Sequence, residues 1–262
     1  MIQVSKAHAF GNDFLFVPAS DNGADLAALA RAMCDRHHGI GADGLIVYTL
    51  RAGGAAMQLL NADGSASELS GNGMRCLAAL VARTERLSPG AGITIDTDAG
   101  VKALELLARE GERYTFRSAM GQPEELRQVE ISVGSERIAA SVLRMGNPQC
   151  VVLGPLPDAE RFNRIGPALS THAMFAKGTN VEFAHIEASG RVRILIWERG
   201  VGPTTSSGTG SSAAAVAAAA HGGAARTVDV VAPGGTQRVE WRDDGVYLTG
   251  WAEVVLDGHW TK

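Results

Sequence analysis

The stretch SSGTGSSAAAVAAAA, residues 206–220, joins a serine and a Gly-x-Gly turn directly to an alanine-rich helical segment. The stretch LSGNGMRCLAALVAR, residues 69–83, repeats this order. Capping of a helix explains the serine but not the two glycines that follow it. Glycine admits close approach to the backbone, and the first N–H groups of a helix carry partial positive charge. Each turn is therefore a candidate cradle for a carboxylate or a phosphate.

The two turns occupy matching places in the two halves of the chain, each after a strand-like segment. This repeat predicts an α+β fold of two pseudo-symmetric lobes, residues 1–120 and 121–262. The alanines leave little side-chain bulk, so a sheet can approach such a helix closely. We expect each lobe to be a β-sheet wrapped around a central helix.

Helical periodicity is confined to four segments, and most of the remaining chain consists of short apolar runs bounded by Gly, Asp and Asn. The predicted helices are residues 25–38, 73–87, 158–172 and 210–223. The predicted strands are residues 14–19, 45–50, 55–64, 93–100, 114–118, 129–134, 138–146, 149–154, 181–187, 192–200, 227–235 and 245–250. Because strands outnumber helices and do not alternate strictly with them, the pattern favours α+β over α/β.

The composition of the chain points to a small ligand. Its 262 residues carry a net charge of -4, with 24 basic and 28 acidic residues scattered along the sequence. No basic stripe for nucleic acid and no polybasic membrane patch is present, so we expect neither partner. There is no apolar stretch of membrane-spanning length and no secretory signal pattern, which predicts a cytoplasmic protein. Three distant cysteines, Cys34, Cys76 and Cys150, predict reduced, buried thiols.

Several common motifs are absent or out of context. GIGADG, residues 39–44, satisfies Gly-x-Gly-x-x-Gly but follows a helix and precedes a strand, which is the reverse of a dinucleotide site. No lysine follows the glycines of residues 208–210 as in a phosphate-binding P-loop. His37 and His38 are adjacent, and no HExxH or paired CxxC occurs, so no metal is expected. Neither Ser70 nor Ser207 lies in G-x-S-x-G, which leaves a hydrolase as a minor alternative.

Seven stretches together resemble the diaminopimelate epimerase family in their order and spacing across nearly the whole chain. They are KAHAFGNDF (6–14), DRHHGIGADG (35–44), LNADGS (60–65), SGNGMRC (70–76), GNPQC (146–150), TNVEF (179–183) and ERGVGPTTSSGTGS (198–211). The resemblance implies two similar lobes with the active site between them. It also implies a cofactor-independent isomerase of lysine biosynthesis that interconverts LL- and meso-diaminopimelate. The sequence does not decide between a monomer and a homodimer.

In this family a thiolate removes the α-proton on one face of the substrate and a thiol returns a proton on the other. Both of these cysteine positions are serine here, Ser70 and Ser207. An alcohol is a far weaker acid than a thiol, whose unperturbed pKa is about 8.5. The family's histidine after Gly-Asn-Pro is Gln149, whereas the carboxylate that partners the second catalytic position is retained as Glu198. The resemblance thus implies Ser70, Ser207 and Glu198 as the catalytic set.

The family's substrate-binding residues are largely kept. Asn61, Asn147, Asn180 and Arg199 match those that hold the distal end of the amino acid, and Asn12 matches a further substrate contact. Guanidinium binds a carboxylate in a bidentate way, so such a clamp suits a second carboxylate. The substrate's α-carboxylate would lie on the backbone N–H groups of Gly71, Asn72, Gly208 and Thr209. Any one asparagine alone is more simply read as a turn residue.

Three hypotheses follow from a retained binding set and an altered catalytic set. The first is an epimerase in which Ser70 and Ser207 are the acid and the base, with Glu198 assisting Ser207. The second is a related proton-shift isomerase or dehydratase with Glu198 as the base. The third is a protein that binds diaminopimelate without turning it over. In all three, a side chain at Gly71 or Gly208 would obstruct the carboxylate and is expected to strain the backbone.

Overall fold

The computed structural model describes residues 1–20, 25–68 and 70–261, which form four helices and seventeen strands in two compact units. The helices are α1 (Leu26–Cys34), α2 (Gly71–Thr84), α3 (Ala159–Ser170) and α4 (Gly208–His221). The first strands are β1 (Ile2–Ala9), β2 (Asn12–Pro18), β3 (Gly44–Arg51), β4 (Gly54–Asn61), β5 (Ala66–Ser67), β6 (Gly92–Thr97), β7 (Gly100–Glu110) and β8 (Arg113–Gly121). The others are β9 (Glu124–Val133), β10 (Glu136–Arg144), β11 (Pro148–Leu153), β12 (Asn180–Ala188), β13 (Arg191–Glu198), β14 (Gly202–Thr204), β15 (Thr227–Ala232), β16 (Gly235–Arg242) and β17 (Gly245–Trp260).

The strands of the first unit pair into a ring. The order is β1, β2, β3, β4, β6, β7, β8 and β17, and β17 pairs again with β1. The pairs β2–β3 and β4–β6 are parallel, so each needs a crossover, and these crossovers contain α1 and α2. The antiparallel pairs of the ring include β1–β2, β3–β4, β6–β7, β7–β8 and β1–β17.

The second unit repeats this topology element by element. β10 pairs with β11, β11 with β12 in parallel across α3, and β12 with β13. β13 then pairs with β15 in parallel across α4, followed by β16 and β17. The short strands β5 and β14 precede α2 and α4 respectively. The sequence of connections is therefore the same in both units, which confirms the predicted repeat within a sheet-dominated α+β fold.

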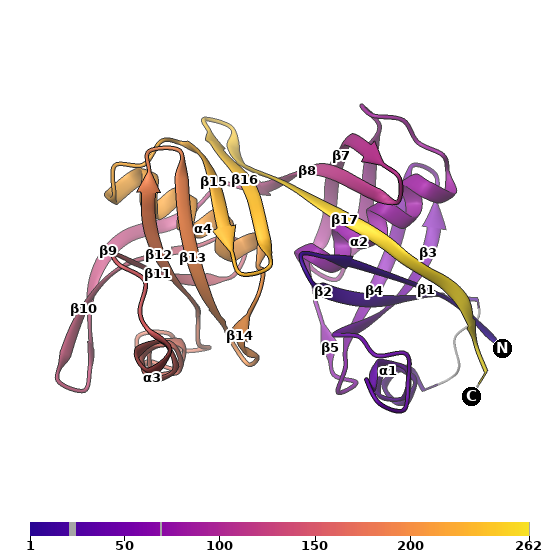
Figure 1. Cartoon of the computed structure of the whole chain (residues 1–262), viewed down its shortest axis with the longest axis horizontal. Helices are drawn as coiled ribbons and strands as arrows, with labels where there is room; N and C mark the ends of the chain where they lie inside the picture. The colour runs from indigo at the N-terminus through magenta and orange to yellow at the C-terminus, as the bar shows by residue number, and fades with distance from the viewer. Residues whose placement is uncertain (21–24, 69, 262) are drawn as a thin grey trace. The chain divides into compact units, whose positions relative to one another are not determined.

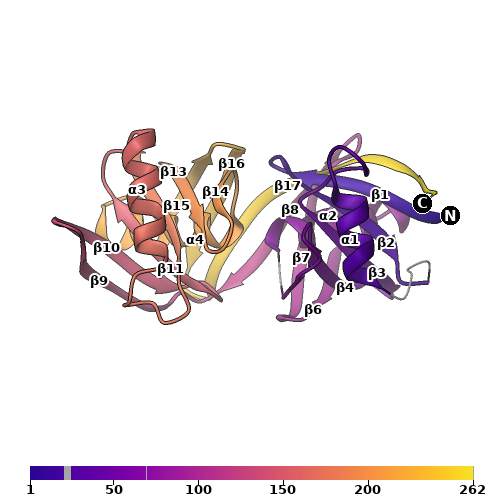
Figure 2. The ribbon, with the colours of Figure 1, turned by 90° about the horizontal axis from the view of Figure 1, so that it is seen from below.

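Alternation along the strands places one helix on each face of each sheet. In the first unit Phe14, Phe16 and Ile46 belong to the core around α2, whereas Leu15 and Leu45 belong to the core around α1. Successive side chains of a strand point to opposite faces, so strands covered on both faces must be apolar throughout. Figure 1 shows α2 running between the strands of its unit, and Figure 2 shows α1 and α3 against other faces of their sheets.

The small residues of α4 give it a core position. Its residues from Ala213 to Ala218 are at most 3% exposed, and α4 packs against strands β10 to β13, β15 and β16. The helix α2 is buried in the same way from Asn72 to Ala82 and packs against β1, β2, β4, β6 and β7. Both helices begin two residues before the predicted segments, at Gly71 and Gly208, because the Ser-Gly-x-Gly turns form their caps and first residues.

The division of the chain at residue 120 does not hold for its last part. One unit comprises Met1–Ser118 together with Gly250–Lys262, and the other comprises Ala119–Thr249. The second half of β17 pairs with β1 of the first unit, from Lys6↔Leu256 to Ile2↔Trp260. This pairing covers the backbone groups that β1 would otherwise expose at a sheet edge.

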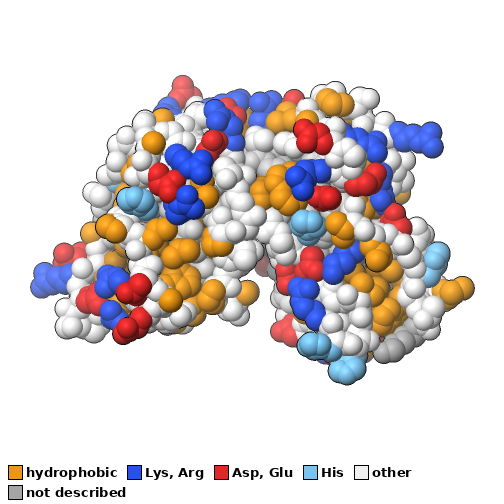
Figure 3. Space-filling view, in the orientation of Figure 1, with side chains coloured by type: hydrophobic (Ala, Val, Ile, Leu, Met, Phe, Trp, Pro, Cys, Tyr) orange, Lys and Arg blue, Asp and Glu red, His pale blue; other side chains and the backbone are white. Residues whose placement is uncertain are grey.

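All predicted strands are present, but β1, β7, β16 and the short strands β5 and β14 were not predicted. The sequence of β7, GVKALELLARE, consists largely of good helix formers. It is a strand because β6 and β8 flank it and pair with it on both sides. Among the described residues, no helix is long and apolar enough to cross a membrane. On the visible face in Figure 3, basic and acidic side chains are intermixed.

Candidate active site

The first serine–glycine turn forms the N-terminus of α2. The Ser70 Oγ accepts a hydrogen bond from the Gly73 N–H at 3.1 Å, and the Ser70 carbonyl accepts one from the Met74 N–H at 2.8 Å. The N–H groups of Gly71 and Asn72 precede the first intrahelical bond and have no acceptor within the helix. The serine is thus the helix cap, and two N–H groups at the positive end of the helix dipole remain for an anion.

The second turn has the same geometry at the start of α4. The Ser207 Oγ accepts from the Gly210 N–H at 3.1 Å, and the Ser207 carbonyl accepts from the Ser211 N–H at 3.0 Å. Gly208 and Thr209 take the places of Gly71 and Asn72. Ser207 is buried, with 8% of its surface exposed. Each unit thus holds a capping serine at the start of its core helix.

The glycines of these turns divide into two kinds. A Cβ added to Gly71 would meet no heavy atom of the described residues within 4 Å, whereas one added to Gly73 would lie 2.9 Å from Ile46 Cδ1. Gly71 and Gly208 do not have a positive φ. The expectation of backbone strain at these two positions was therefore wrong. Obstruction of a ligand remains as the reason for glycine at position 71. Packing against Ile46 explains the glycine at position 73.

Two predicted substrate residues of the first unit are in direct contact. The Asn72 Nδ2 donates to the Asn12 Oδ1 at 3.2 Å, and the Asn12 Nδ2 donates to the Asp43 Oδ2 at 2.6 Å. Asn61 instead makes a turn at the end of β4, where its Nδ2 donates to the Ser65 Oγ at 2.9 Å. The structure thus brings Asn12 and Asn72 together at the α2 turn.

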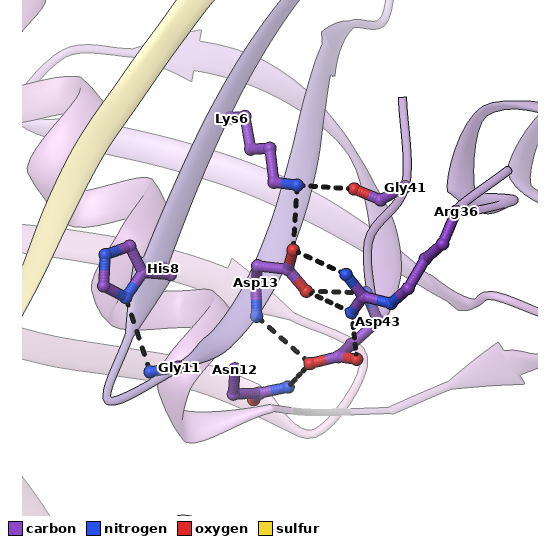
Figure 4. A network of polar contacts seen from close by, with 8 residues as sticks. All are labelled: Lys6, His8, Gly11, Asn12, Asp13, Arg36, Gly41 and Asp43. Atoms are coloured by element: carbon purple, nitrogen blue, oxygen red, sulfur yellow. Dashed lines mark hydrogen bonds and ion pairs between the residues drawn. The ribbon is translucent and has the colours of Figure 1, made fainter. Parts of the chain in front are cut away.

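An ion cluster holds this part of the site in place (Figure 4). Arg36 binds both carboxylate oxygens of Asp13 at 2.8 and 3.2 Å and reaches Asp43 at 2.8 Å. The Lys6 Nζ lies 2.9 Å from Asp13 and donates to the Gly41 carbonyl at 2.6 Å. Burial alone would raise the pKa of Asp13, but hydrogen bonds from Arg36 and Lys6 outweigh it, so the pKa is lowered. The sequence analysis did not predict this cluster, although its residues lie in the quoted stretches KAHAFGNDF (6–14) and DRHHGIGADG (35–44).

The predicted binding residues of the second unit gather at the adjacent ends of β11, β12 and β13. Gln149 and Asn180 are register partners in parallel strands, and the Gln149 Nε2 donates to the Asn147 Oδ1 at 2.6 Å. The Arg199 N–H donates to the Asn180 Oδ1 at 2.9 Å, and the Arg199 Nη1 donates to the Lys177 carbonyl at 3.0 Å. Asn147, Asn180 and Arg199 therefore form one group, next to Gln149.

Two carboxyl groups of this unit, Glu182 and Glu198, lie close enough for their charges to interact, and the sequence analysis predicted only Glu198. Glu198 ends β13 and is half-buried. Glu182 in β12 is fully buried, and among the described residues neither of its oxygens has a hydrogen-bond partner. A Cβ on Gly210 would lie 2.5 Å from the Glu182 Oε1 and 3.1 Å from the Ser207 Oγ, which places Glu182 beneath the first turn of α4. Burial, and then the charge of Glu198, raises the pKa of Glu182 well above its usual range.

The cysteines are buried thiols, as predicted. All three are free, Cys76 lies within α2, and Cys150 lies within β11. Burial raises the pKa of Cys150 to about 12, and it raises that of Cys76 as well. Neither thiol is suited to act as a base, because burial disfavours its thiolate form.

Comparisons with known proteins identify the family and the fold of the chain. The family model for diaminopimelate epimerase matches residues 4–126 and 141–255. A diaminopimelate epimerase from Desulforudis audaxviator is 40% identical over 280 residues, covering 100% of both chains. Another from Desulfitobacterium hafniense is 35% identical, covering 98% of this chain and 97% of the relative. The fold is similar to that of a probable proline racemase from Agrobacterium radiobacter, with a TM-score of 0.74 at 17% identity, covering 100% of this chain and 93% of that chain. By sequence match over nearly its whole length, the chain belongs to the diaminopimelate epimerase family.

Proposed function

We propose that this protein is an isomerase that interconverts LL- and meso-diaminopimelate by proton transfer at the α-carbon, without a cofactor. The observation that carries the proposal is the identity of 40% to a diaminopimelate epimerase over the full length of both chains. The two serine-capped helices, one in each repeat of the fold, add a physical argument. Inversion at a carbon needs one group on each face, and a repeated fold supplies two equivalent groups.

In the proposed reaction Ser70 and Ser207 take the positions of the acid and the base. One oxygen removes the α-proton from one face, and the other group returns a proton from the opposite face. Glu198, which the resemblance pairs with Ser207, would accept and return the serine's proton. Gln149 has no titratable group, so Ser70 has no comparable helper there. We therefore expect slow turnover that rises with pH, since the alcohol or its carboxylate partner must be deprotonated to act as a base.

The binding groups suit a substrate with two carboxylates. The N–H groups of Gly71 and Asn72, with those of Gly208 and Thr209, would hold the α-carboxylate at the positive ends of α2 and α4. Arg199, oriented through its backbone by Asn180, would hold the distal carboxylate. Asn61 and Asn147 would complete the distal contacts, and Asn12 would contact the substrate beside Asn72.

Calorimetric titration tests the substrate. Diaminopimelate should bind, whereas lysine, which has the same chain length without the second carboxylate, should bind at least tenfold more weakly, because Arg199 then loses its partner. Arg199→Met should remove this discrimination, since both ligands would then lack the guanidinium contact. Equal affinity of the unaltered protein for the two amino acids would argue against a distal carboxylate site.

Gly71→Ala tests the helix cradle. The methyl group would meet no heavy atom of the described residues within 4 Å, so the free energy of unfolding should stay within about 1 kcal/mol. Diaminopimelate binding should weaken at least tenfold, because the methyl group obstructs the backbone N–H groups. Gly208→Ala is expected to weaken binding in the same way.

Gly73→Ala is the matched control within the same turn. Its methyl group would press on Ile46 and Phe14, which are themselves buried, so stability should fall by about 1–3 kcal/mol. A capping role alone predicts that Gly71→Ala leaves affinity intact, and that result would remove the cradle from the proposal.

A second candidate is binding of diaminopimelate without turnover, or a different proton shift with Glu198 as the base. The serines in place of both thiols, together with Gln149, favour it, because these changes remove the easily ionised groups. Exchange of the α-proton for deuterium in deuterated water separates epimerisation from binding alone. A chemical change of diaminopimelate at a position other than the α-carbon would reveal the different proton shift.

A further inference from the structure

Arg75 is a fully buried cation one turn into α2. Its side chain is 1% exposed and is the largest of the fully buried side chains among the described residues. Its guanidinium lies over the ring of Phe10, 5.8 Å from the centroid. The backbone of Gly250 passes beside it, and a Cβ there would lie 3.1 Å from the Arg75 Cζ. Gly250 thus leaves the space that the guanidinium fills.

The guanidinium lacks the partner that a buried arginine usually has. Among residues 1–20, 25–68 and 70–261, no carboxylate pairs with Arg75, and its Nε has no hydrogen-bond acceptor. Burial lowers the pKa of Arg75 to about 10, which shows that the charge is costly in this place. Replacement of buried charged residues by apolar side chains of similar volume is often neutral or stabilising, so packing alone does not explain the arginine.

Within the part of the chain that the structure describes, the one hydrogen bond of Arg75 runs to the turn that forms the candidate anion cradle. Its Nη1 donates to the Asn72 Oδ1 at 3.1 Å. The Asn72 Nδ2 in turn donates to the Asn12 Oδ1 at 3.2 Å, and the Asn12 Nδ2 donates to the Asp43 Oδ2 at 2.6 Å. Asn12 and Asn72 therefore form a relay between a buried cation and a surface carboxylate.

The groups at the two ends of this relay, Arg75 and Asp43, determine which amide atoms donate and which accept. An amide group can usually be turned over so that its oxygen and nitrogen exchange places. Arginine has only donors and an ionised carboxylate has only acceptors, so Arg75 must face an amide oxygen and Asp43 must face an amide nitrogen. Each amide in between then has one orientation, and each keeps one N–H hydrogen that the relay does not use.

We propose that Arg75 is a positioning residue for the diaminopimelate site: through Asn72 it fixes the orientation of the Asn72 and Asn12 amides and adds positive charge behind the N-terminus of α2. The link between Arg75 and the diaminopimelate site rests on the proposed function. The orientation of the two amides by Arg75 does not depend on it. The ion cluster fixes the Asn12 end of the relay through Asp43, whereas Arg75 donates to the Asn72 amide oxygen at the other end.

The side-chain amides of Asn72 and Asn12 give a direct test in the ligand-free protein. In Arg75→Met, an apolar replacement of similar length, the Asn72 Nδ2 resonances should shift, and hydrogen exchange of both side-chain amides should accelerate at least tenfold. Arg75→Gln, which keeps one donor, should restore slower exchange in part. Unchanged exchange in Arg75→Met would overturn the proposal, whatever the substrate proves to be.

Titration with diaminopimelate tests the link to the site. Arg75→Met should bind about 10- to 100-fold more weakly, with a urea midpoint equal to or above that of the unaltered protein. Arg83→Met is the matched control on the same helix, because Arg83 pairs with Asp257 and Glu112 away from the turn. It should leave affinity unchanged and lower the urea midpoint slightly.

The combination of readouts separates the two proposals. A loss of affinity in Arg75→Met without a loss of stability supports positioning, whereas a fall in both, reproduced by Arg83→Met, would show a purely structural arginine and overturn it. Full affinity in Arg75→Met would also overturn it. If the unaltered protein binds no diaminopimelate, the proposed function fails, and the amide exchange still decides the orientation by Arg75.

Discussion

Ser70→Cys together with Ser207→Cys should raise the rate of α-proton exchange of diaminopimelate by about 10²- to 10⁴-fold, the range that a well-matched general acid and base contributes. A thiol has a pKa of about 8.5, so a fraction is thiolate at neutral pH, and a helix N-terminus increases that fraction. Both positions are N-caps of core helices, where the dipole favours the anion. Deuterium incorporation, followed by proton NMR in deuterated water, measures the rate.

The same substitutions should cost stability, which gives an internal control. Each serine caps its helix by accepting a backbone N–H at 3.1 Å, and sulfur is a weak acceptor. Loss of an N-cap costs about 0.5–2 kcal/mol, so the double variant should have a lower melting temperature while being more active. Ser70→Ala and Ser207→Ala should lose stability to a similar degree without gaining activity.

The single variants decide whether both faces are used. A two-sided mechanism predicts that either cysteine alone gives much less than the gain of the pair, because inversion needs an acid and a base. If the double cysteine variant exchanges no faster than the unaltered protein while still binding diaminopimelate, epimerisation at these two positions is ruled out. The non-catalytic or proton-shift alternative would then stand.

Glu182→Gln should stabilise the protein at neutral pH and have almost no effect near pH 4. The folded-state pKa of Glu182 is raised, chiefly by burial, so between about pH 4.3 and that pKa the carboxyl ionises only in the unfolded chain. Each pH unit in this window removes about 1.4 kcal/mol of stability from the unaltered protein. Glutamine does not ionise, so the difference in urea midpoint should widen as the pH rises.

Glu187→Gln is the matched control, because Glu187 lies on the same strand but bonds Arg193 and Arg191 at the surface. Hydrogen bonds from Arg193 and then Arg191 lower its pKa, so its stabilising effect is present at neutral pH and fades as the pH falls through the folded-state pKa. Glu187→Gln should therefore lower the urea midpoint at neutral pH only. A midpoint for Glu182→Gln that falls most at neutral pH would show that Glu182 is ionised and paired.

Local patterns in the sequence were sufficient for the repeat and for its core helices. The serine–glycine turns and the apolar runs behind them specify both the caps and the helices α2 and α4. Cap chemistry and helical periodicity act within a few residues, so they can be recognised without knowing the neighbours in space. The strands that are covered on both faces also appear as continuous apolar runs.

Elements stabilised mainly by their neighbours were missed. The segment of β7 favours a helix by composition, and only its pairing with β6 and β8 makes it a strand. The return of residues 250–262 to the first unit depends on an unpaired edge of β1, some 250 residues away in the chain. No local pattern records which distant strand will cover an edge.

Motifs and their spacing were enough to recognise the family, the repeat and the two turns that begin with Ser70 and Ser207. The packing of the helices on the sheets, which the sequence does not reveal, buries Arg75 and Glu182 beside the two turns. Among the described residues Arg75 has no carboxylate partner, and burial raises the pKa of Glu182. In the sequence they are a single arginine in an apolar helix and a glutamate between Val181 and Phe183. Their burial follows from which helix covers which face of which sheet, and desolvation, a property of the packed surroundings, sets their chemistry.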